Sequence, residues 1–338
     1  MPRNNEWLEQ VVEESLEPDL PICDPHHHLW DLRPDSPEPR YLLDDLLADT
    51  NSGHNIVSTI FIECHAMYRQ DGPEELKPVG EVEFVNGIAA MSASGLYGET
   101  KVAAGIIGHA DLTRGAAAGD VLDALDAAGG GRFRGIRHAV AWDKEPAIRN
   151  HRTNPPEHRY MDPVFREGLA QLGPRKHTFE AWCYMNQIGE LADMARNAPD
   201  VTIILNHFGG PLGLGGYEGK REEVLEFWRG EIVELAKCEN VVAKLGGLNM
   251  DINGFHWHEQ PKPPTSQQLI DATRPFFEHT IEQFGVDRCM FESNFPVDKL
   301  SCSYNVCWNS FKILTKDYSA DEKAKLYHDT ATRVYSLD

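Results

Sequence analysis

Short apolar runs alternate with longer amphipathic segments along most of the chain. The apolar runs have the length of buried β-strands, whereas the segments between them repeat apolar residues with the period of an α-helix. Ser319 and Glu322 have the spacing of a capping box at the start of the last helical segment. The pattern predicts eight strands, at residues 22–28, 56–65, 102–110, 133–140, 178–184, 201–207, 241–248 and 289–293. It predicts helices at residues 82–94, 121–128, 164–172, 188–197, 222–238, 269–284, 304–314 and 321–335.

Eight strands that alternate with helices over about 300 residues indicate an α/β fold, the (β/α)8 TIM barrel. We expect one barrel domain over residues 21–338, preceded by an acidic N-terminal arm at residues 1–20. An open doubly wound sheet is the alternative, but no glycine-rich dinucleotide-binding sequence follows the first strand. The polar or proline-rich stretches 34–39, 143–159 and 261–264 are expected to be long loops after strands, which build the active-site face of such barrels.

The composition changes this picture little but excludes some partners. The chain has 338 residues, 41% of them apolar, which is enough for a large core. Its net charge of −21 disfavours nucleic acid as a partner, because phosphate binding needs basic patches. It has no apolar run of about 18 residues and no signal-like start, so we expect a cytoplasmic protein without a membrane partner. Its seven cysteines lack the spacing of zinc or redox motifs and are predicted to be buried, reduced thiols.

Polar residues collect at the carboxyl ends of the predicted strands, which meet at one face of a barrel. His26 and His28 end the first strand, and because side chains alternate along a strand, both point away from His27. Taken singly, a strand-end histidine is often only a hydrogen-bonded core residue, and a strand-end lysine or arginine is often the ion-pair partner of a nearby glutamate. Together these residues favour a catalytic cleft. The other candidates at or near strand ends are Glu63, His65, His109, Arg137, His138, Tyr184, His207, Lys244, Glu292 and Asn294.

Several short motifs occur in order from the first strand to the last. They are Asp24-Pro-His-His-His-Leu-Trp30, Gly105-Ile-Ile-Gly-His-Ala-Asp-Leu112, Phe133-Arg-Gly-Ile-Arg-His138, Asn206-His-Phe-Gly-Gly-Pro211, Lys244-Leu-Gly-Gly-Leu248 and Met290-Phe-Glu-Ser-Asn-Phe-Pro296. In these motifs the chain resembles the amidohydrolase superfamily, in particular its "amidohydrolase 2" and lactonase-like branch. The resemblance implies the same barrel and an enzyme that hydrolyses an ester, lactone or amide with activated water.

The resemblance also implies roles for three histidines. In metal-using members the strand-one pair and the strand-six histidine are among the metal ligands, which corresponds to His26, His28 and His207 here. Neutral imidazoles at these positions would hold one divalent cation, most readily zinc, and the cation would lower the pKa of its water. Other members work without a metal, and there the same histidines hold and polarise the substrate carbonyl. One metal and metal-free catalysis therefore both stay open.

Two departures from the family pattern change the expected site. At the end of strand eight the family carries an aspartate, as metal ligand or base, where this chain has Asn294, whose amide cannot accept a proton near neutral pH. Glu292, on the same face of the strand, and Asp298, in the following turn, are the candidates to replace it. Where members often have another histidine after strand five, residues 181–186 contain none. A two-metal site is therefore not expected.

The remaining polar strand ends are expected to bind a small-molecule substrate. The guanidinium of Arg137, pointing into the barrel, suits a substrate carboxylate. Combined with the lactone or ester hydrolysis that the resemblance implies, the expected substrate is a lactone or cyclic ester of a small carboxylated, aromatic-derived compound. The alternatives are a metal-dependent decarboxylase of the same superfamily and a degenerate barrel that binds its ligand without turnover. A homodimer is a further expectation, because the outer helices of such barrels often pair. The expected substrate-binding residues are Glu63, His65, His109, Arg137, His138, Tyr184 and Lys244.

Overall fold

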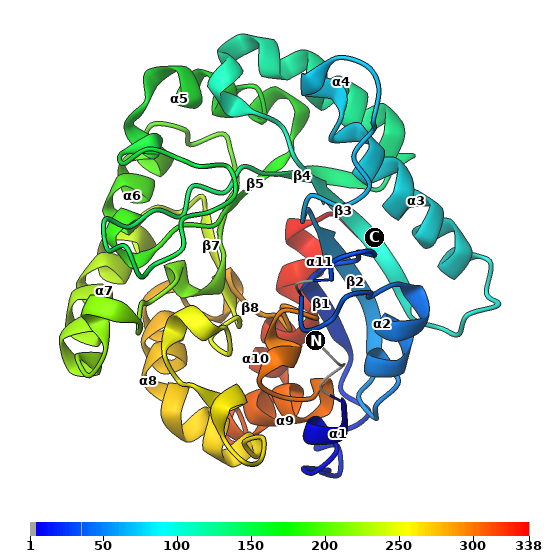
Figure 1. Ribbon diagram of the computed structural model, residues 1–338, viewed down its shortest axis with the longest axis vertical. Coiled ribbons are helices and arrows are strands. Elements are labelled where there is room, and N and C mark those ends of the chain that lie inside the picture. The colour runs from blue at the N-terminus through cyan, green and yellow to red at the C-terminus, as the bar shows by residue number, and fades with distance from the viewer. Residues whose placement is uncertain (1–4, 35, 338) are drawn as a thin grey trace.

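The chain forms a nearly closed barrel of eight parallel strands surrounded by helices (Figure 1). The computed structural model describes residues 5–34 and 36–337. Neighbouring strands pair in chain order from the first to the eighth, and each pair is parallel. The chain after the last strand returns to the first, where the His28 amide donates to the Phe295 carbonyl at 2.8 Å. The predicted α/β TIM barrel is therefore confirmed.

The strands begin close to the predicted residues, but all eight end earlier. Apolar residues continue past the last paired position, so the apolar pattern overestimates the length of each strand. Most of the polar residues predicted at strand ends therefore lie in the first residues of the following loops. The strands are β1 (Ile22–His27), β2 (Ile56–Ile62), β3 (Lys101–Gly108), β4 (Phe133–Arg137), β5 (Thr178–Ala181), β6 (Ile203–Leu205), β7 (Val241–Leu245) and β8 (Cys289–Phe291).

The helices agree with the predicted ranges except near the two ends of the chain. The short helix α2 (Leu43–Thr50) was not predicted, because it follows a proline-rich stretch and spans little more than two turns. The helix predicted at residues 321–335 is divided into α10 (Ala320–Ala324), a π-helical turn (Lys325–Asp329) and α11 (Thr330–Val334). The others are α3 (Val79–Ala93), α4 (Ala118–Gly129), α5 (Pro163–Ala170), α6 (Ile188–Arg196), α7 (Arg221–Ala236), α8 (Ser266–Phe284) and α9 (Tyr304–Leu314).

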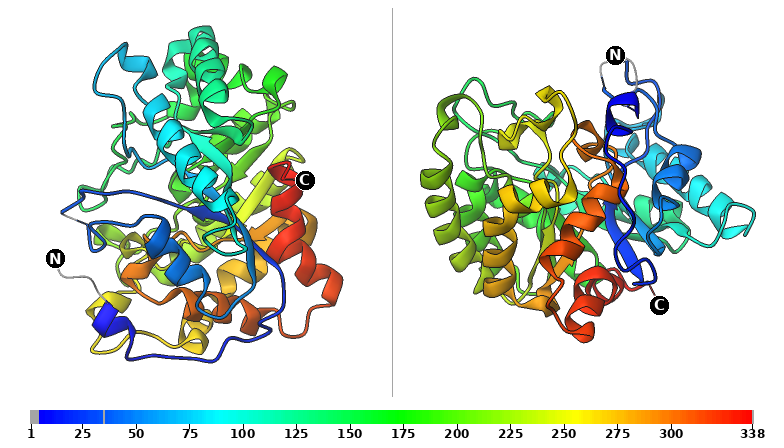
Figure 2. Two further views of the ribbon diagram at one scale, coloured as in Figure 1. Left: turned by 90° about the vertical axis from the view of Figure 1, so that its right-hand side faces the viewer. Right: turned by 90° about the horizontal axis from the view of Figure 1, so that it is seen from below.

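The N-terminal arm lies along the outside of α9 instead of forming a long helix (Figure 2, left). It includes the short helix α1 (Asn5–Leu8), and residues 1–4 of the predicted arm lie outside the described residues. The Leu16 amide donates to the Asn309 side chain at 2.9 Å, and the Lys312 ammonium donates to the Leu16 carbonyl at 2.8 Å. Hydrogen bonds from α9 therefore hold the arm against the barrel.

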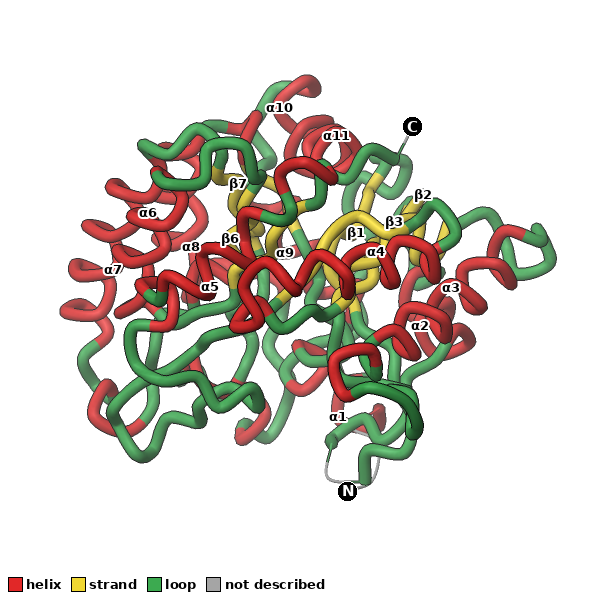
Figure 3. The backbone as a smooth tube through the Cα atoms, turned by 90° about the horizontal axis from the view of Figure 1, so that it is seen from above, coloured by secondary structure: helices red, strands yellow, loops and turns green. Residues whose placement is uncertain are grey.

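An apolar layer fills part of the barrel interior. The C-terminal segment packs against β1 and β8 and contributes Ala331 and Tyr335 to this layer. Figure 3 shows α10 and α11 at one end of the barrel and α1 at the other. The strands contribute Cys23, Ile60, Ile62, Ile107, Ile204, Val242 and Met290.

Two predictions from the composition concern the cysteines and membrane-spanning segments. All seven cysteines are buried and free, as predicted. Within residues 5–34 and 36–337, no helix has the length and apolar character required to cross a membrane.

Candidate active site

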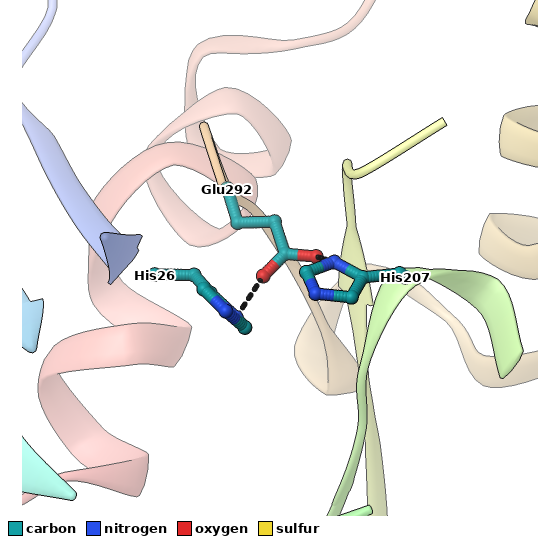
Figure 4. Close-up of side chains that lie close together, drawn as sticks. All are labelled: His26, His207 and Glu292. Carbon is teal, nitrogen blue, oxygen red and sulfur yellow. Dashed lines mark hydrogen bonds and ion pairs between the residues drawn. The ribbon is translucent and has the colours of Figure 1, made fainter. Parts of the chain in front are cut away.

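Three buried side chains, His26, His207 and Glu292, meet inside the barrel (Figure 4). Glu292 lies between the two imidazoles, with Oε1 2.6 Å from Nδ1 of His207 and Oε2 2.7 Å from Nδ1 of His26. His207 is 3% exposed, and the other two residues are fully buried. One potential ligand atom from each residue lies within 4.8 Å of the others. The structure thus brings together two of the predicted histidines and one of the two carboxylates considered in place of the strand-eight aspartate.

Two glycines after β7 make room for this cluster. A Cβ on Gly246 would lie 2.2 Å from the Glu292 carbonyl oxygen, and a Cβ on Gly247 would lie 2.2 Å from Nδ1 of His207. Gly247 also has a φ of +76°, which side chains of L-residues rarely allow. The Gly-Gly pair of the strand-seven motif therefore lets His207 and Glu292 pack directly against the backbone that follows β7.

Burial controls protonation in the cluster. It raises the pKa of Glu292 to about 8, so this carboxyl favours its protonated form near neutral pH. Burial also lowers the pKa of His26 and of His207 well below the ordinary value, and the positive charges of Lys244 and Arg137 lower both further. Both imidazoles are therefore neutral at pH 7, which is the state in which histidine binds a metal ion.

The donor set fits a divalent cation. Oε2 of Glu292 is buried, and among the described residues it receives no hydrogen bond, although Nδ1 of His26 lies 2.7 Å away. A carboxylate oxygen in such a position binds either a proton or a cation, which supplies the missing interaction. Two imidazoles and one carboxylate are a ligand set of catalytic zinc sites, which keep a further position open for water.

His28, the third histidine expected to bind a metal, lies next to this group but is not part of it. Its ring centroid is 5.0 Å from that of His26, with the two rings nearly perpendicular at 84°. Its Nδ1 bonds to the Ile62 carbonyl at 2.8 Å. A carbonyl only accepts hydrogen bonds, so Nδ1 carries the proton and Nε2 is left as an acceptor in the neutral ring.

Glu63 holds Arg137 at the edge of the cluster. Nε of Arg137 lies 2.8 Å from Oε1 of Glu63, and Nη1 lies 3.4 Å from Nε2 of His26. Arg152, which was not predicted, reaches the other Glu63 oxygen from the long loop after β4. Burial would raise the pKa of Glu63, but Arg152 and Arg137 hold it well below its ordinary value. One ionised carboxylate is therefore shared by two guanidiniums, which leaves a net positive charge beside His26.

Lys244 pairs with Glu180 of β5, and not with Glu63 or Glu292. Its Nζ lies 2.8 Å from Oε2 of Glu180 and 3.3 Å from Nδ1 of His26. Glu180 was not predicted as a site residue, although a charged residue inside an apolar strand is a usable signal. Glu63 and Glu180 thus each have a cationic partner. Glu292 has no lysine or arginine within ion-pair distance in the described part of the chain.

Asn294 and Asp298 bond to each other in the loop after β8. Nδ2 of Asn294 donates to Asp298 at 2.8 Å, and the Asn249 backbone amide donates to the other Asp298 oxygen at 3.2 Å. Burial raises the pKa of Asp298 to about 8. The Asn294 backbone amide donates to the His26 carbonyl at 3.0 Å, which ties this loop to β1. Both residues lie outside the group formed by His26, His207 and Glu292.

Two other predicted residues, His65 and His109, line a neighbouring cavity of about 500 Å³. His138 is buried behind His109, with ring centroids 5.2 Å apart. The Tyr184 hydroxyl donates to the Arg149 carbonyl at 2.6 Å and so holds the loop after β4 in place. The predicted residues thus lie partly in the buried cluster, partly along the cavity and partly, as with Tyr184, in neither. The cavity is lined by His65, Tyr68, Glu74, Glu75, Pro78, His109, Asp111, Arg114, Arg152 and Thr153.

Comparison with known proteins agrees with the resemblance seen in the motifs. The protein-family model described as amidohydrolase matches residues 23–337. The chain belongs to the amidohydrolase family. A relative from Sinorhizobium fredii, the uncharacterized protein y4mH, is 33% identical over 338 residues, which cover 94% of this chain and 99% of the relative.

Two more distant similarities are to a lactonase and to a zinc-containing crystal structure. The L-fucono-1,5-lactonase of Burkholderia multivorans is 25% identical over 210 residues, which cover 62% of this chain and 64% of that enzyme. A crystal structure of an amidohydrolase from the same organism with bound zinc has a TM-score of 0.72 at 22% identity, over 94% of this chain and 99% of that one. The structural likeness shows the shared fold. Membership of the family makes this amidohydrolase a hydrolase.

We expect the substitution Gly247→Ala to disrupt the cluster of this amidohydrolase. The added Cβ would meet Nδ1 of His207 at 2.2 Å, so the imidazole must move away from Glu292. Gly219→Ala is the matched control, because Gly219 has a similar φ of +71° but nothing within 4 Å of an added Cβ. Zinc affinity, measured by competition with a chromogenic chelator, is expected to fall at least about tenfold in Gly247→Ala only. Equal affinities in the two variants would contradict a metal-binding role for His207.

The ionisation of Asp298 is expected to lower the stability of this amidohydrolase as the pH rises. Its pKa is about 8 in the folded protein and ordinarily 3.8, so its contribution to stability is full below pH 3.8 and is lost as the pH rises to 8. Asp298→Asn removes this dependence, and the Asn294 amide can turn over to keep its hydrogen bond. From pH 5 to pH 8 the melting temperature of the wild type, followed by circular dichroism, is expected to fall roughly 5 °C more than that of the variant. Parallel curves would show that Asp298 is already ionised at pH 5.

Proposed function

We propose that this amidohydrolase hydrolyses a lactone or related cyclic ester of a small carboxylated compound, with His26, His207 and Glu292 as the reaction centre. The observation that carries the proposal is the buried Glu292 carboxylate between two neutral imidazoles. A carboxylate whose pKa has been raised toward neutrality is suited to removing a proton from water at physiological pH. Membership of the amidohydrolase family and the lactonase relative support this class of substrate.

In the proposed reaction, ionised Glu292 accepts a proton from water while the water oxygen attacks the carbonyl carbon of the lactone. Negative charge develops on the former carbonyl oxygen. The guanidinium of Arg137, with Nη1 3.4 Å from Nε2 of His26, is a fixed positive charge that stabilises this oxygen. When the ring C–O bond breaks, Glu292 returns its proton to the departing alkoxide. The product is a hydroxy acid that loses a proton to the solvent, and Glu292 is ionised again.

The same three side chains would hold one divalent cation, most readily zinc. Bound there, the cation would supply a water of lowered pKa and polarise the substrate carbonyl. His26 and His207 are already in the neutral form that this requires, and Glu292 must release its proton. His28 presents Nε2 as an acceptor that can orient a water molecule or a substrate hydroxyl.

The cavity beside the cluster is the proposed substrate-binding site. Arg152 lines this cavity and contacts Glu63, and the other partner of Glu63 is Arg137, beside His26. Because two guanidiniums share the Glu63 carboxylate, positive charge gathers at the Arg152 side of the cavity and suits a substrate carboxylate, whereas Glu74, Glu75 and Asp111 also line the cavity. His65 and His109 line the same cavity and can bond to the hydroxyl groups of such a compound.

The substitution Glu292→Gln tests the proposal. Glutamine keeps the size of the side chain but cannot accept a proton, so kcat/KM on a panel of sugar lactones and carboxylated lactones is expected to fall at least about a hundredfold. Acid release in a pH-stat measures lactone hydrolysis, and parallel detection of carbon dioxide distinguishes it from the alternative reaction, decarboxylation.

Glu81→Gln is the matched control for this substitution. Glu81 is also buried, and burial raises its pKa to about 7. Its Oε1 accepts hydrogen bonds from the backbone amides of Cys64 and Ala66, a role that glutamine can also fill. We expect kcat/KM within about twofold of the wild type for this control, as for most changes away from reacting groups. Wild-type activity in Glu292→Gln, or carbon dioxide without ester hydrolysis, would overturn the proposal.

A further inference from the structure

A second buried polar group connects the reaction centre with the C-terminal segment of the chain. It consists of Glu180 on β5, Lys244 on β7 and Tyr335, the residue after α11. All three are fully buried, and Tyr335 packs among apolar interior residues such as Ile204 and Val242. The hydrolytic steps above use neither Glu180 nor Tyr335.

Glu180 is the centre of this group. Its Oε2 accepts hydrogen bonds from Lys244 at 2.8 Å and from the Asn206 amide at 2.5 Å, and its Oε1 accepts one from the Tyr335 hydroxyl. The Lys244 ammonium also lies over the Tyr335 ring, 5.5 Å from its centroid. The same ammonium lies 3.3 Å from Nδ1 of His26. A continuous series of contacts therefore leads from Tyr335 to His26.

Stability alone gives no reason for an ion pair at this place. Taking a lysine and a glutamate out of water carries a large desolvation cost, and a buried ion pair is often no more stabilising than well-packed apolar residues of the same volume. The neighbouring interior positions are apolar, so an apolar pair would continue the existing layer. What the ion pair adds is a fixed position for the Lys244 ammonium beside His26.

We propose that Tyr335, Glu180 and Lys244 form a positioning chain that fixes the orientation of the His26 ring in the reaction centre. The proposal rests on the function assigned above to His26, His207 and Glu292. The Tyr335 hydroxyl holds the Glu180 carboxylate, the carboxylate holds the Lys244 ammonium, and the ammonium limits the rotation of the His26 ring. The C-terminal segment thus takes part in catalysis through positioning residues, none of which reacts with the substrate.

Tyr335→Phe tests this chain because it removes the hydroxyl and keeps the aromatic ring. We expect kcat to fall roughly tenfold with KM unchanged, the usual effect of removing a partner that orients a catalytic ligand. Tyr327→Phe is the matched control, since Tyr327 is buried in the same C-terminal segment and its hydroxyl bonds to Thr315 instead. We expect wild-type kcat for Tyr327→Phe and similar melting temperatures for the two variants. Equal kcat values in the two variants would overturn the inference.

Nuclear magnetic resonance of the metal-free protein labelled with [15N]histidine gives a readout that needs no substrate. The His26 signals are expected to shift in Tyr335→Phe and to stay in place in Tyr327→Phe. If the wild type hydrolyses no lactone, the proposed function fails, whereas the His26 signals still test the chain. Unchanged His26 signals in Tyr335→Phe would overturn the inference.

A comparison in a second background shows whether Tyr335 acts through the ion pair. The double substitution Glu180→Gln, Lys244→Met removes both charges together and so avoids leaving one buried charge unpaired. In this background, adding Tyr335→Phe is expected to cause no further loss of kcat and no further shift of the His26 signals, because residues acting in one series are not additive. A full additional tenfold loss would show that Tyr335 acts by another route.

Discussion

The site depends on one buried carboxylate, that of Glu292, held between two imidazoles inside the barrel. Burial makes its ionised form costly, and this raises its pKa to about 8. Two features keep the arrangement in place: the glycine pair after β7 leaves no side chain between the backbone and the cluster, and burial keeps both histidines neutral. A carboxylate under these conditions binds either a proton or a metal ion, and the chemistry of the site depends on which of the two Glu292 binds.

The nearby charges are arranged so that they influence Glu292 without pairing with it. Arg137 is engaged by Glu63, and Lys244 is engaged by Glu180, yet both cations lie within 3.4 Å of His26. If either cation paired with Glu292 directly, the carboxylate would be a poor base, because a close positive charge lowers its pKa. The two ion pairs therefore place positive charge where a reaction intermediate needs it and leave the base free.

Much of the fold follows from local sequence, and much of the site does not. Repeated strand–helix units are compatible with few topologies, so the apolar pattern predicts the barrel. The alternation of side chains along a strand separates His26 from His27, whose ring bonds to Thr59 at 2.8 Å. The partner of Lys244 was not predicted, because Glu180 lies 64 residues away and meets it only when the barrel closes. Arg152 was missed for a related reason: it lies in a long loop without periodicity, and its position depends on the contacts of that loop.

Zinc K-edge X-ray absorption spectroscopy of the zinc-loaded enzyme tests the reaction centre most directly. Two imidazole ligands with Zn–N distances of about 2.0–2.1 Å are expected, the remaining ligands being oxygen. In His207→Ala the imidazole count is expected to fall to one. Sulfur ligands at about 2.3 Å, or an imidazole count that His207→Ala leaves unchanged, would contradict a reaction centre formed by His26, His207 and Glu292.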